Sequence, residues 1–208
     1  MGLEIQKNWS FKSENVAENF MTHVRGQLPF YDLVVESICK MGRNFVKNGD
    51  RIYDIGSATG NMSIKMRELV EARNASYIAI DNADEVLAQS KLKDHKNFRF
   101  IKSDAVTFDF VCFDLCIINL VLMFIHPSHR AGLLNRLKKL CRPHGAIILT
   151  EKFYPPGGFY STVNNRLLWS WKLDTNPAEE VVQKELSLEG IQVPLAEAEA
   201  EGFTEWFR

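Results

Sequence analysis

The sequence predicts an α/β protein built on a doubly wound, mostly parallel sheet. Five short β-rich runs alternate with segments whose apolar residues recur at helical spacing. The longest run, 113–122, is almost continuously apolar, which is typical of a strand buried on both faces. Strands that alternate with helices join through right-handed crossovers, so the pattern favours parallel strands with helices on both faces.

Size and charge fit one domain spanning residues 1–208. The 25 Lys and Arg residues balance 26 Asp and Glu residues, leaving a net charge of −1. We therefore expect no nucleic acid or anionic membrane held by bulk charge. No apolar run reaches the roughly 18–20 residues that span a bilayer, and the start has no apolar leader. Four cysteines in apolar surroundings are typical of buried thiols in a reducing compartment, so we expect a cytoplasmic protein.

Each element follows from a local pattern. Two helices within 13–39, interrupted at Pro29, precede the first strand. The expected strands are 51–55, 77–80, 98–101, 113–122 and 146–150, the last one entered by a turn at 143–145. The expected helices between them are 62–72, 83–92 and 127–140.

The alternation stops after Glu151. Pro155-Pro156-Gly157-Gly158 predicts a loop, and an aromatic segment and a helix at 178–188 follow it. We interpret 153–190 as a helical cap over the carboxyl ends of the strands. The tail, 195–208, predicts a helix and the start of a strand at FTEWF.

The loop after the first strand carries the first candidate site. Asp54, Gly56 and Gly60 form a D-x-G-x-x-x-G pattern before the next helix. A dinucleotide loop needs a further glycine so that the backbone can approach a pyrophosphate. Ser57 and Ala58 occupy that space, so the loop favours a ligand without phosphates there.

Polar residues also end the next three strands. Asp81 and Asn82 follow the second strand at the spacing of a carboxylate that binds both ribose hydroxyls. Asp104 and Ala105 close the third strand, and Asn119 interrupts the fourth. Each residue alone is explained as a turn former or a satisfied amide. Together they predict a nucleoside cofactor, with S-adenosylmethionine favoured over NAD by the glycine spacing. No metal site is predicted, because His126 and His129 lack a further ligand.

Longer motifs carry a family resemblance over residues 9–207. They are LPFYDLV, YDIGSATGNMS, AIDNADEVL, the run from INLVLMF to ILTEKF, and GFTEWF. The chain resembles the class I S-adenosylmethionine-dependent methyltransferases, which have a Rossmann-like fold. Within them it is most similar to the carboxy-S-adenosyl-L-methionine synthases of the tRNA wobble-uridine modification pathway.

The resemblance implies a site and a reaction. It implies cofactor contacts from Tyr31, Gly56, Ser57, Ala58, Asp81, Asn82, Asp104, Ala105 and Asn119. It also implies that prephenate carboxylates the cofactor's methyl group, giving carboxy-S-adenosylmethionine and phenylpyruvate. No catalytic residue is fixed, and the candidates are Tyr31, Asn119, Lys184 and Glu185.

Two departures from the family stand out. The family holds the new carboxylate with an arginine of the cap helix, and alignment places Glu185 there. A carboxylate would repel that group, so Lys184 or Arg166 is the expected substitute. The family also continues into an antiparallel strand pair beyond GFTEWFR, and without it one sheet edge is open.

Three functions are consistent with the sequence, in this order of preference. The first is carboxy-S-adenosylmethionine synthesis. The second is ordinary methyl transfer to a small acceptor, whose pocket Tyr31, Tyr160, Trp169 and Trp171 would shape. The third is binding of cofactor or partner without turnover. In each case we expect no membrane and no direct nucleic-acid partner, and a homodimer is the assembly considered.

Overall fold

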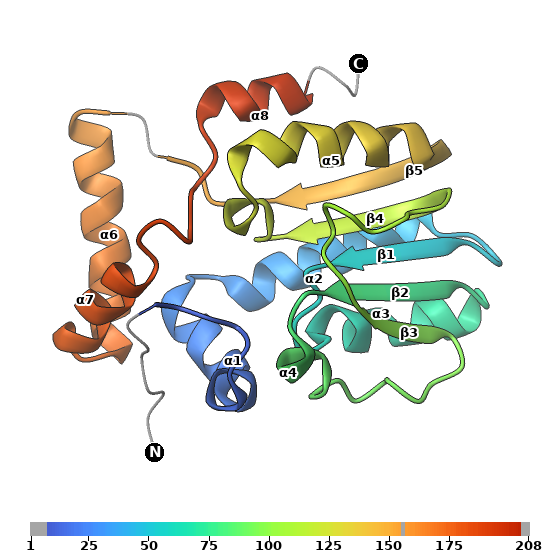
Figure 1. Cartoon of the computed structure of the whole chain (residues 1–208), viewed down its shortest axis with the longest axis horizontal. Coiled ribbons are helices and arrows are strands. Elements are labelled where there is room, and N and C mark those ends of the chain that lie inside the picture. Colours follow the sequence, from blue (N-terminus) through green and yellow to red (C-terminus); the bar gives the residue numbers. More distant parts are fainter. Residues whose placement is uncertain (1–7, 155–156, 205–208) are drawn as a thin grey trace.

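The central sheet of the computed structural model, which describes residues 8–154 and 157–204, is parallel throughout. Its order is β3-β2-β1-β4-β5, and every neighbouring pair is parallel (Figure 1). The strands are β1 (Arg51–Ile55), β2 (Ser76–Asp81), β3 (Phe98–Lys102), β4 (Phe113–Asn119) and β5 (Cys141–Thr150). The predicted doubly wound fold is confirmed. Strand order reverses at β1, between β2 and β4, where ligands bind in such sheets.

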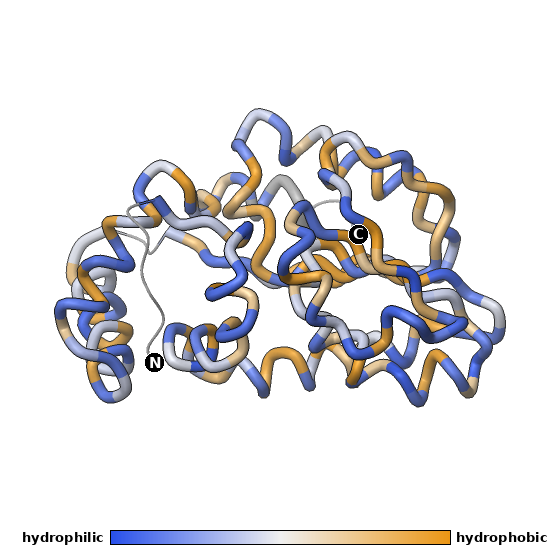
Figure 2. Tube along the Cα trace, turned by 60° about the horizontal axis from the view of Figure 1, so that its bottom comes forward, coloured by the Kyte–Doolittle hydropathy of each residue, from blue (hydrophilic) through white to orange (hydrophobic). Residues whose placement is uncertain are grey.

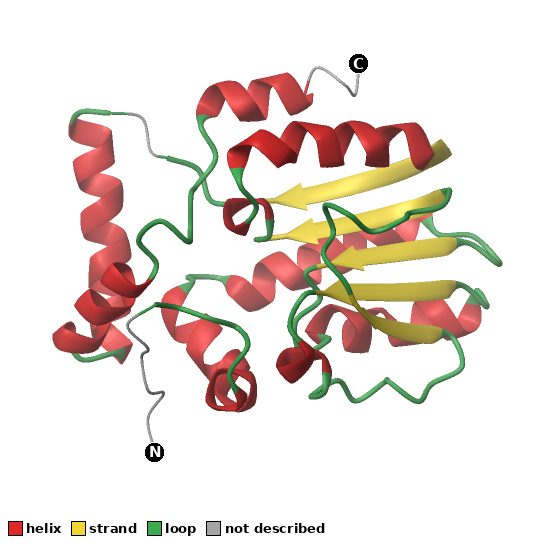
Figure 3. Cartoon of the chain, viewed as in Figure 1, coloured by secondary structure: helices red, strands yellow, loops and turns green. Residues whose placement is uncertain are grey.

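Helices cover both faces of this sheet and gather beyond the carboxyl ends of its strands (Figure 3). The bounds are α1 (Glu14–Gln27), α2 (Tyr31–Gly42), η1 (Arg43–Phe45), α3 (Asn61–Ala72), α4 (Asp84–Leu87), η2 (Leu122–Phe124), α5 (Pro127–Leu140), α6 (Phe159–Thr175), α7 (Ala178–Ser187) and α8 (Glu197–Thr204). Helices α1, α6 and α7 lie beyond the arrowheads in Figure 1. The cap predicted over 153–190 thus contains α6 and α7, and its standing as a separate subregion stays a prediction.

Two apolar clusters stabilise the sheet, one on each face. The first joins α2 and α3 to the sheet, and Met66 and Leu115 are fully buried in it. The second joins α5 to the opposite face, where Tyr53, Phe113 and Leu137 are buried. Apolar and polar stretches alternate along the trace in Figure 2. In the strands, successive side chains point to opposite faces, so both faces of the sheet contribute to the core.

Three local predictions were too simple. The helix expected at 83–92 ends at Leu87, because the next turns close with i→i+3 bonds and Ser90 Oγ accepts from Leu92 N. The strand expected at 113–122 ends at Asn119, since Leu120 adopts φ 60° and η2 follows. The turn expected at 143–145 lies inside β5, where a register shift and φ 67° at His144 absorb it.

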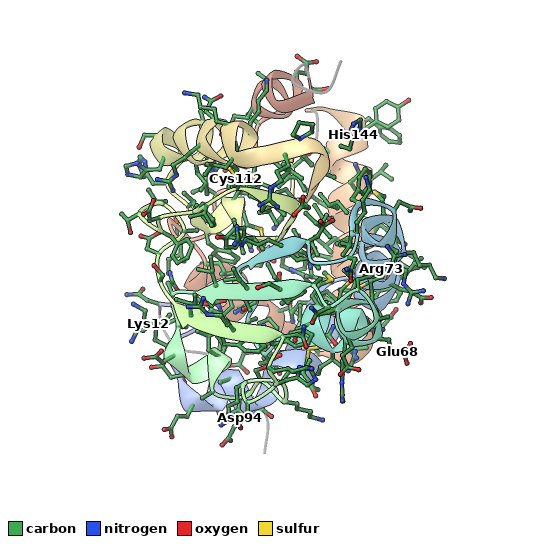
Figure 4. All side chains as sticks on the ribbon, turned by 90° about the vertical axis from the view of Figure 1, so that its right-hand side faces the viewer. Lys12, Glu68, Arg73, Asp94, Cys112 and His144 are labelled. Carbon is green, nitrogen blue, oxygen red and sulfur yellow. The ribbon has the colours of Figure 1, made fainter. Side chains whose placement is uncertain are left out.

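Two further expectations concern the ends of elements. Part of the predicted strand at FTEWF belongs to α8, and the rest lies outside the described residues. Cys112 was expected to be buried, but it precedes β4 and is exposed, because the strand begins only at Phe113. Figure 4 faces the amino-terminal end of the sheet, where Cys112 lies, opposite to the carboxyl ends. No helix of the described residues is long and apolar enough to cross a membrane.

Arg130 ties the segment after α7 to α5. Its side chain is 1% exposed, donates to Ile125 O (2.9 Å) and Val193 O (2.6 Å), and pairs with Glu199 (3.2 Å). A buried guanidinium is tolerated when its donors are satisfied in this way. The contacts hold Val193 and Glu199, which follow α7 in the chain, against α5.

Candidate functional site

A cavity of about 460 Å³ lies at the carboxyl ends of the strands, between the sheet and α1, α6 and α7. Nearly all the predicted site residues line this cleft. They are Tyr31, Asp54, Gly56, Ser57, Ala58, Asp81, Asn82, Asp104, Ala105, Asn119, Lys184 and Glu185. Gly60 serves the loop instead: it caps α3 with φ 78°, a conformation that favours glycine.

The loop after β1 is tightly held against β2. Gly56 N and Ser57 N both donate to Ile80 O, at 2.7 and 3.2 Å. Gly56 has φ 69°, and a Cβ atom there would collide with the side chain of Val121. The positive φ and the close approach of the Val121 side chain both favour glycine at position 56.

Asp81 bridges the β1 loop and the start of α4. Its Oδ2 accepts from Ala58 N (2.9 Å), and its Oδ1 accepts from Ala83 N (3.0 Å). Burial raises the pKa of this carboxyl, while the backbone donors oppose the rise. Each carboxylate oxygen can accept a second hydrogen bond, so Asp81 can organise the loop and still bind hydroxyl groups in the cleft.

Asp54 is a buried carboxyl beneath the cleft. It is 3% exposed, and Tyr77 Oη donates to its Oδ2 at 2.7 Å. Burial raises the pKa of Asp54 to about 7; the Tyr77 hydrogen bond opposes this rise, and the charge of Asp81 adds to it. The group is thus poised between its neutral and charged forms near neutral pH.

Buried polar atoms without a partner among the described residues converge on the cleft. Five of them belong to residues that line it: Gln27 Nε2, Ser57 Oγ, Asn61 Nδ2, Asn119 Oδ1 and Lys184 Nζ. Buried polar groups in proteins are almost always hydrogen-bonded. Donors and acceptors left open around one cavity therefore fit a polar ligand such as a nucleoside, whose hydroxyl, ring and amino groups offer both.

The cap end of the cleft is basic. Lys152, Lys172 and Lys184 line it with Glu185, and Lys172 is ion-paired with Glu185. The expected substitute Arg166 is exposed and does not line the cavity.

Three of the four aromatic residues expected to shape an acceptor pocket do not line the cleft. Tyr160 is 72% exposed, and Trp169 and Trp171 are more than one-third exposed and also lie outside the lining. The prediction was wrong for these three because α6 turns the face that carries Leu168 and Lys172 toward the cleft. Tyr31 does line the cleft, and burial raises the pKa of its phenol.

Sequence reasoning missed several lining residues. Trp9, His23, Gln27, Glu151, Lys152 and Lys172 all belong to this set. Glu151 Oε1 accepts from Val121 N (2.8 Å) and Leu122 N (2.6 Å), which fixes the loop after β4. A carboxylate directly after the last strand was the available signal for Glu151.

Similarity to known proteins agrees with this geometry. A methyltransferase-domain family model matches residues 52–145. The carboxy-S-adenosyl-L-methionine synthase of Staphylococcus epidermidis is 33% identical in an alignment of 193 residues that covers 90% of this chain and 82% of the relative. The synthase of Photorhabdus laumondii is 29% identical over 196 residues, with 89% and 76% covered.

Solved structures share the fold at lower identity. The YcgJ protein of Bacillus subtilis superposes with a TM-score of 0.58 at 14% identity, covering 84% of this chain and 67% of that one. Phosphoethanolamine N-methyltransferase 2 of Haemonchus contortus, in complex with S-adenosyl-L-methionine, also gives 0.58, at 16% identity with 87% and 44% covered. The chain therefore belongs to the carboxy-S-adenosyl-L-methionine synthase family, within the S-adenosylmethionine-dependent transferases of the methyltransferase fold.

Proposed function

We propose that this protein carboxylates S-adenosylmethionine, using prephenate as the source of the carboxyl group. The products would be carboxy-S-adenosylmethionine, phenylpyruvate and water. One observation carries the proposal. Buried polar atoms without a hydrogen-bond partner among the described residues line the cleft of this chain, and lysines line the end of the cleft next to α6 and α7.

The residues suit this chemistry by position. The cofactor supplies a sulfonium that acidifies its methyl C–H bonds. Asp81 would bind the ribose hydroxyls, Ser57 and Asn119 would bind polar groups of the nucleoside, and Asp104 would lie at the adenine end. The protein's main contribution would be to hold both substrates in register and to exclude water.

The direct test is product analysis. Purified protein with S-adenosylmethionine and prephenate should yield a cofactor heavier by one carboxyl group in mass spectrometry, and phenylpyruvate should accumulate in equal amount. Unchanged cofactor would contradict the proposal.

A second candidate is methyl transfer to a small acceptor. Glu185 favours it, because a carboxylate stands where the family resemblance expects an arginine. This reaction releases S-adenosylhomocysteine, which the same mass spectra would detect. Binding without turnover, the third hypothesis, is disfavoured by membership in an enzyme family.

A further inference from the structure

The cap end of the cleft has an excess of positive charge. Lys152 follows β5, while Lys172 and Lys184 come from α6 and α7. Lys172 is paired with Glu185, and Lys152 Nζ donates to the uncharged Gln192 Oε1 at 2.9 Å. Glu185 thus pairs with one lysine of the three, and Glu151, a further carboxylate of the lining, accepts from backbone N–H groups of the loop after β4. Lys152 and Lys184 therefore have no carboxylate partner among the described residues.

Among these three lysines, Lys184 is the one whose N–H groups have no hydrogen-bond acceptor among the described residues. Its side chain is 4% exposed, its ammonium lies over the Trp9 ring, and Nζ has no hydrogen-bond partner among the described residues. An aromatic face stabilises a cation on one side only. The ammonium has three N–H donors, so an acceptor is missing on the side that faces the cleft.

We propose that Lys152, Lys172 and Lys184 form a binding site for a carboxylate group, to which Lys184 donates directly. The inference rests on the proposed function in one respect: it takes the nucleoside part of the ligand to bind at the carboxyl ends of β1, β2 and β4. The carboxylate has three chemically equivalent sources: the amino-acid end of the cofactor, the carboxyl group added to it, or a carboxylic-acid co-substrate. The lysines of this chain would then do what the expected arginine does elsewhere.

The same geometry couples binding to proton uptake. Burial, followed by the charge of Lys172, lowers the pKa of Lys184 to about 6, while Glu185 opposes this shift. His23, on α1, has a pKa lowered to about 3 by burial and the two lysines, so it is neutral at pH 8. Lys152 is the remaining basic neighbour. At pH 8 the empty site holds Lys184 largely as the amine. A bound carboxylate favours the ammonium, so the site takes up a proton.

Calorimetric titration of the full chain tests the site with four probes. They are 5′-methylthioadenosine, which has no carboxylate, S-adenosylmethionine, carboxy-S-adenosylmethionine, and prephenate added to the S-adenosylhomocysteine complex. The variants are Lys184→Met and Lys184→Gln, with Lys184→Arg as the charge-preserving rescue. Lys93→Met, on an exposed lysine remote from the cleft, is the matched control.

Removal of Lys184 should weaken at least one carboxylate-bearing probe by about tenfold or more. Binding of 5′-methylthioadenosine should stay within about twofold, and Lys184→Arg should restore most of the loss. The probe that weakens identifies the source of the carboxylate. At pH 8, titrations in buffers of different ionisation enthalpy should show proton uptake by the wild type that is absent from Lys184→Met.

The proposal is overturned if all four probes bind the Lys184 variants as they bind the wild type, with equal proton uptake. An equal loss of affinity for 5′-methylthioadenosine also overturns it, because that result indicates that the substitution disrupts the nucleoside site and not a carboxylate site. Lys184→Met, Lys184→Gln and Lys184→Arg are three independent variants, so poor folding of one of them does not remove the test. Absence of carboxylated product would contradict the proposed function alone, while a selective loss of carboxylate binding would still support this site.

Discussion

Lys172 on α6 is ion-paired with Glu185 on α7 at the cap end of the cleft. The carboxylate at the position of the expected arginine is therefore already neutralised by this chain's own lysine. The net charge at this end of the cleft therefore depends on Lys152, Lys172 and Lys184 together with Glu185.

Neutralising Glu185 should strengthen carboxylate binding. Glu185→Gln removes the negative charge closest to the lysines, so we expect carboxy-S-adenosylmethionine to bind about threefold to tenfold more tightly. Glu189→Gln, on an exposed position outside the lining, is the control. Weaker binding of the carboxylated cofactor in calorimetry would show that Glu185 organises the site instead of opposing the ligand.

Two glycines with similar backbone conformations give a matched test of the β1 loop. Gly56 (φ 69°) and Gly49 (φ 79°) both adopt left-handed conformations, but only at Gly56 would a Cβ collide with a neighbour, Val121. Gly49→Ala should lower the free energy of unfolding by about 1 kcal/mol. Gly56→Ala should cost more and abolish cofactor binding. Equal effects of the two substitutions, measured by urea denaturation and titration, would contradict this account of the loop.

The buried carboxyl of Asp54 should give stability a defined pH dependence. Its folded pKa of about 7 lies above the value of about 3.9 in an unfolded chain. The folded state therefore binds more protons between pH 4 and 7, and the free energy of unfolding falls as pH rises through this window. The contribution is at most about 1.4 kcal/mol per pH unit.

Asp54→Asn keeps an acceptor for Tyr77 and cannot ionise. Its unfolding free energy, measured at several pH values between 4 and 7, should lack this downward slope relative to the wild type. Identical pH profiles would show that Asp54 keeps an ordinary pKa in the folded protein.

Arg130 should be needed for stability. Arg130→Met leaves the carbonyl oxygens of Ile125 and Val193 and the carboxylate of Glu199 without their donor. We expect the free energy of unfolding to fall by about 3 kcal/mol, whereas Arg99→Met, on an exposed position of β3, should change it by less than about 0.5 kcal/mol. Similar denaturation midpoints for the two variants would argue against the buried anchor.

Local patterns were enough to predict the sheet and the polar residues at its edge. Asp81 and Asn119 end β2 and β4, Gly56 directly follows β1, and parallel strands bring their carboxyl ends together. The prediction of one shared cleft thus followed from topology. Their roles as cofactor contacts stay predictions.

The cap could not be predicted in the same way. Trp9 N donates to Ser187 O at 2.9 Å, a contact between distant parts of the chain that brings the start of the chain to α7. At the end of α6, Asn176 Nδ2 donates to Gly26 O of α1 at 3.2 Å, which is also a contact between distant parts of the chain. Aromatic content favoured Trp169 and Trp171, but the helix instead presents Lys172, whose neighbours are set by long-range contacts that no local pattern encodes.

Asp81 tests the central claim most directly. Asp81→Ala removes the carboxylate that accepts from Ala58 N and that we propose binds the ribose hydroxyls, so affinity for S-adenosylmethionine in calorimetry should fall by about tenfold or more. Asp81→Asn, which retains one acceptor oxygen, should lose less. If Asp81→Ala folds and binds S-adenosylmethionine as the wild type does, the cofactor does not occupy the cleft at the ends of β1, β2 and β4.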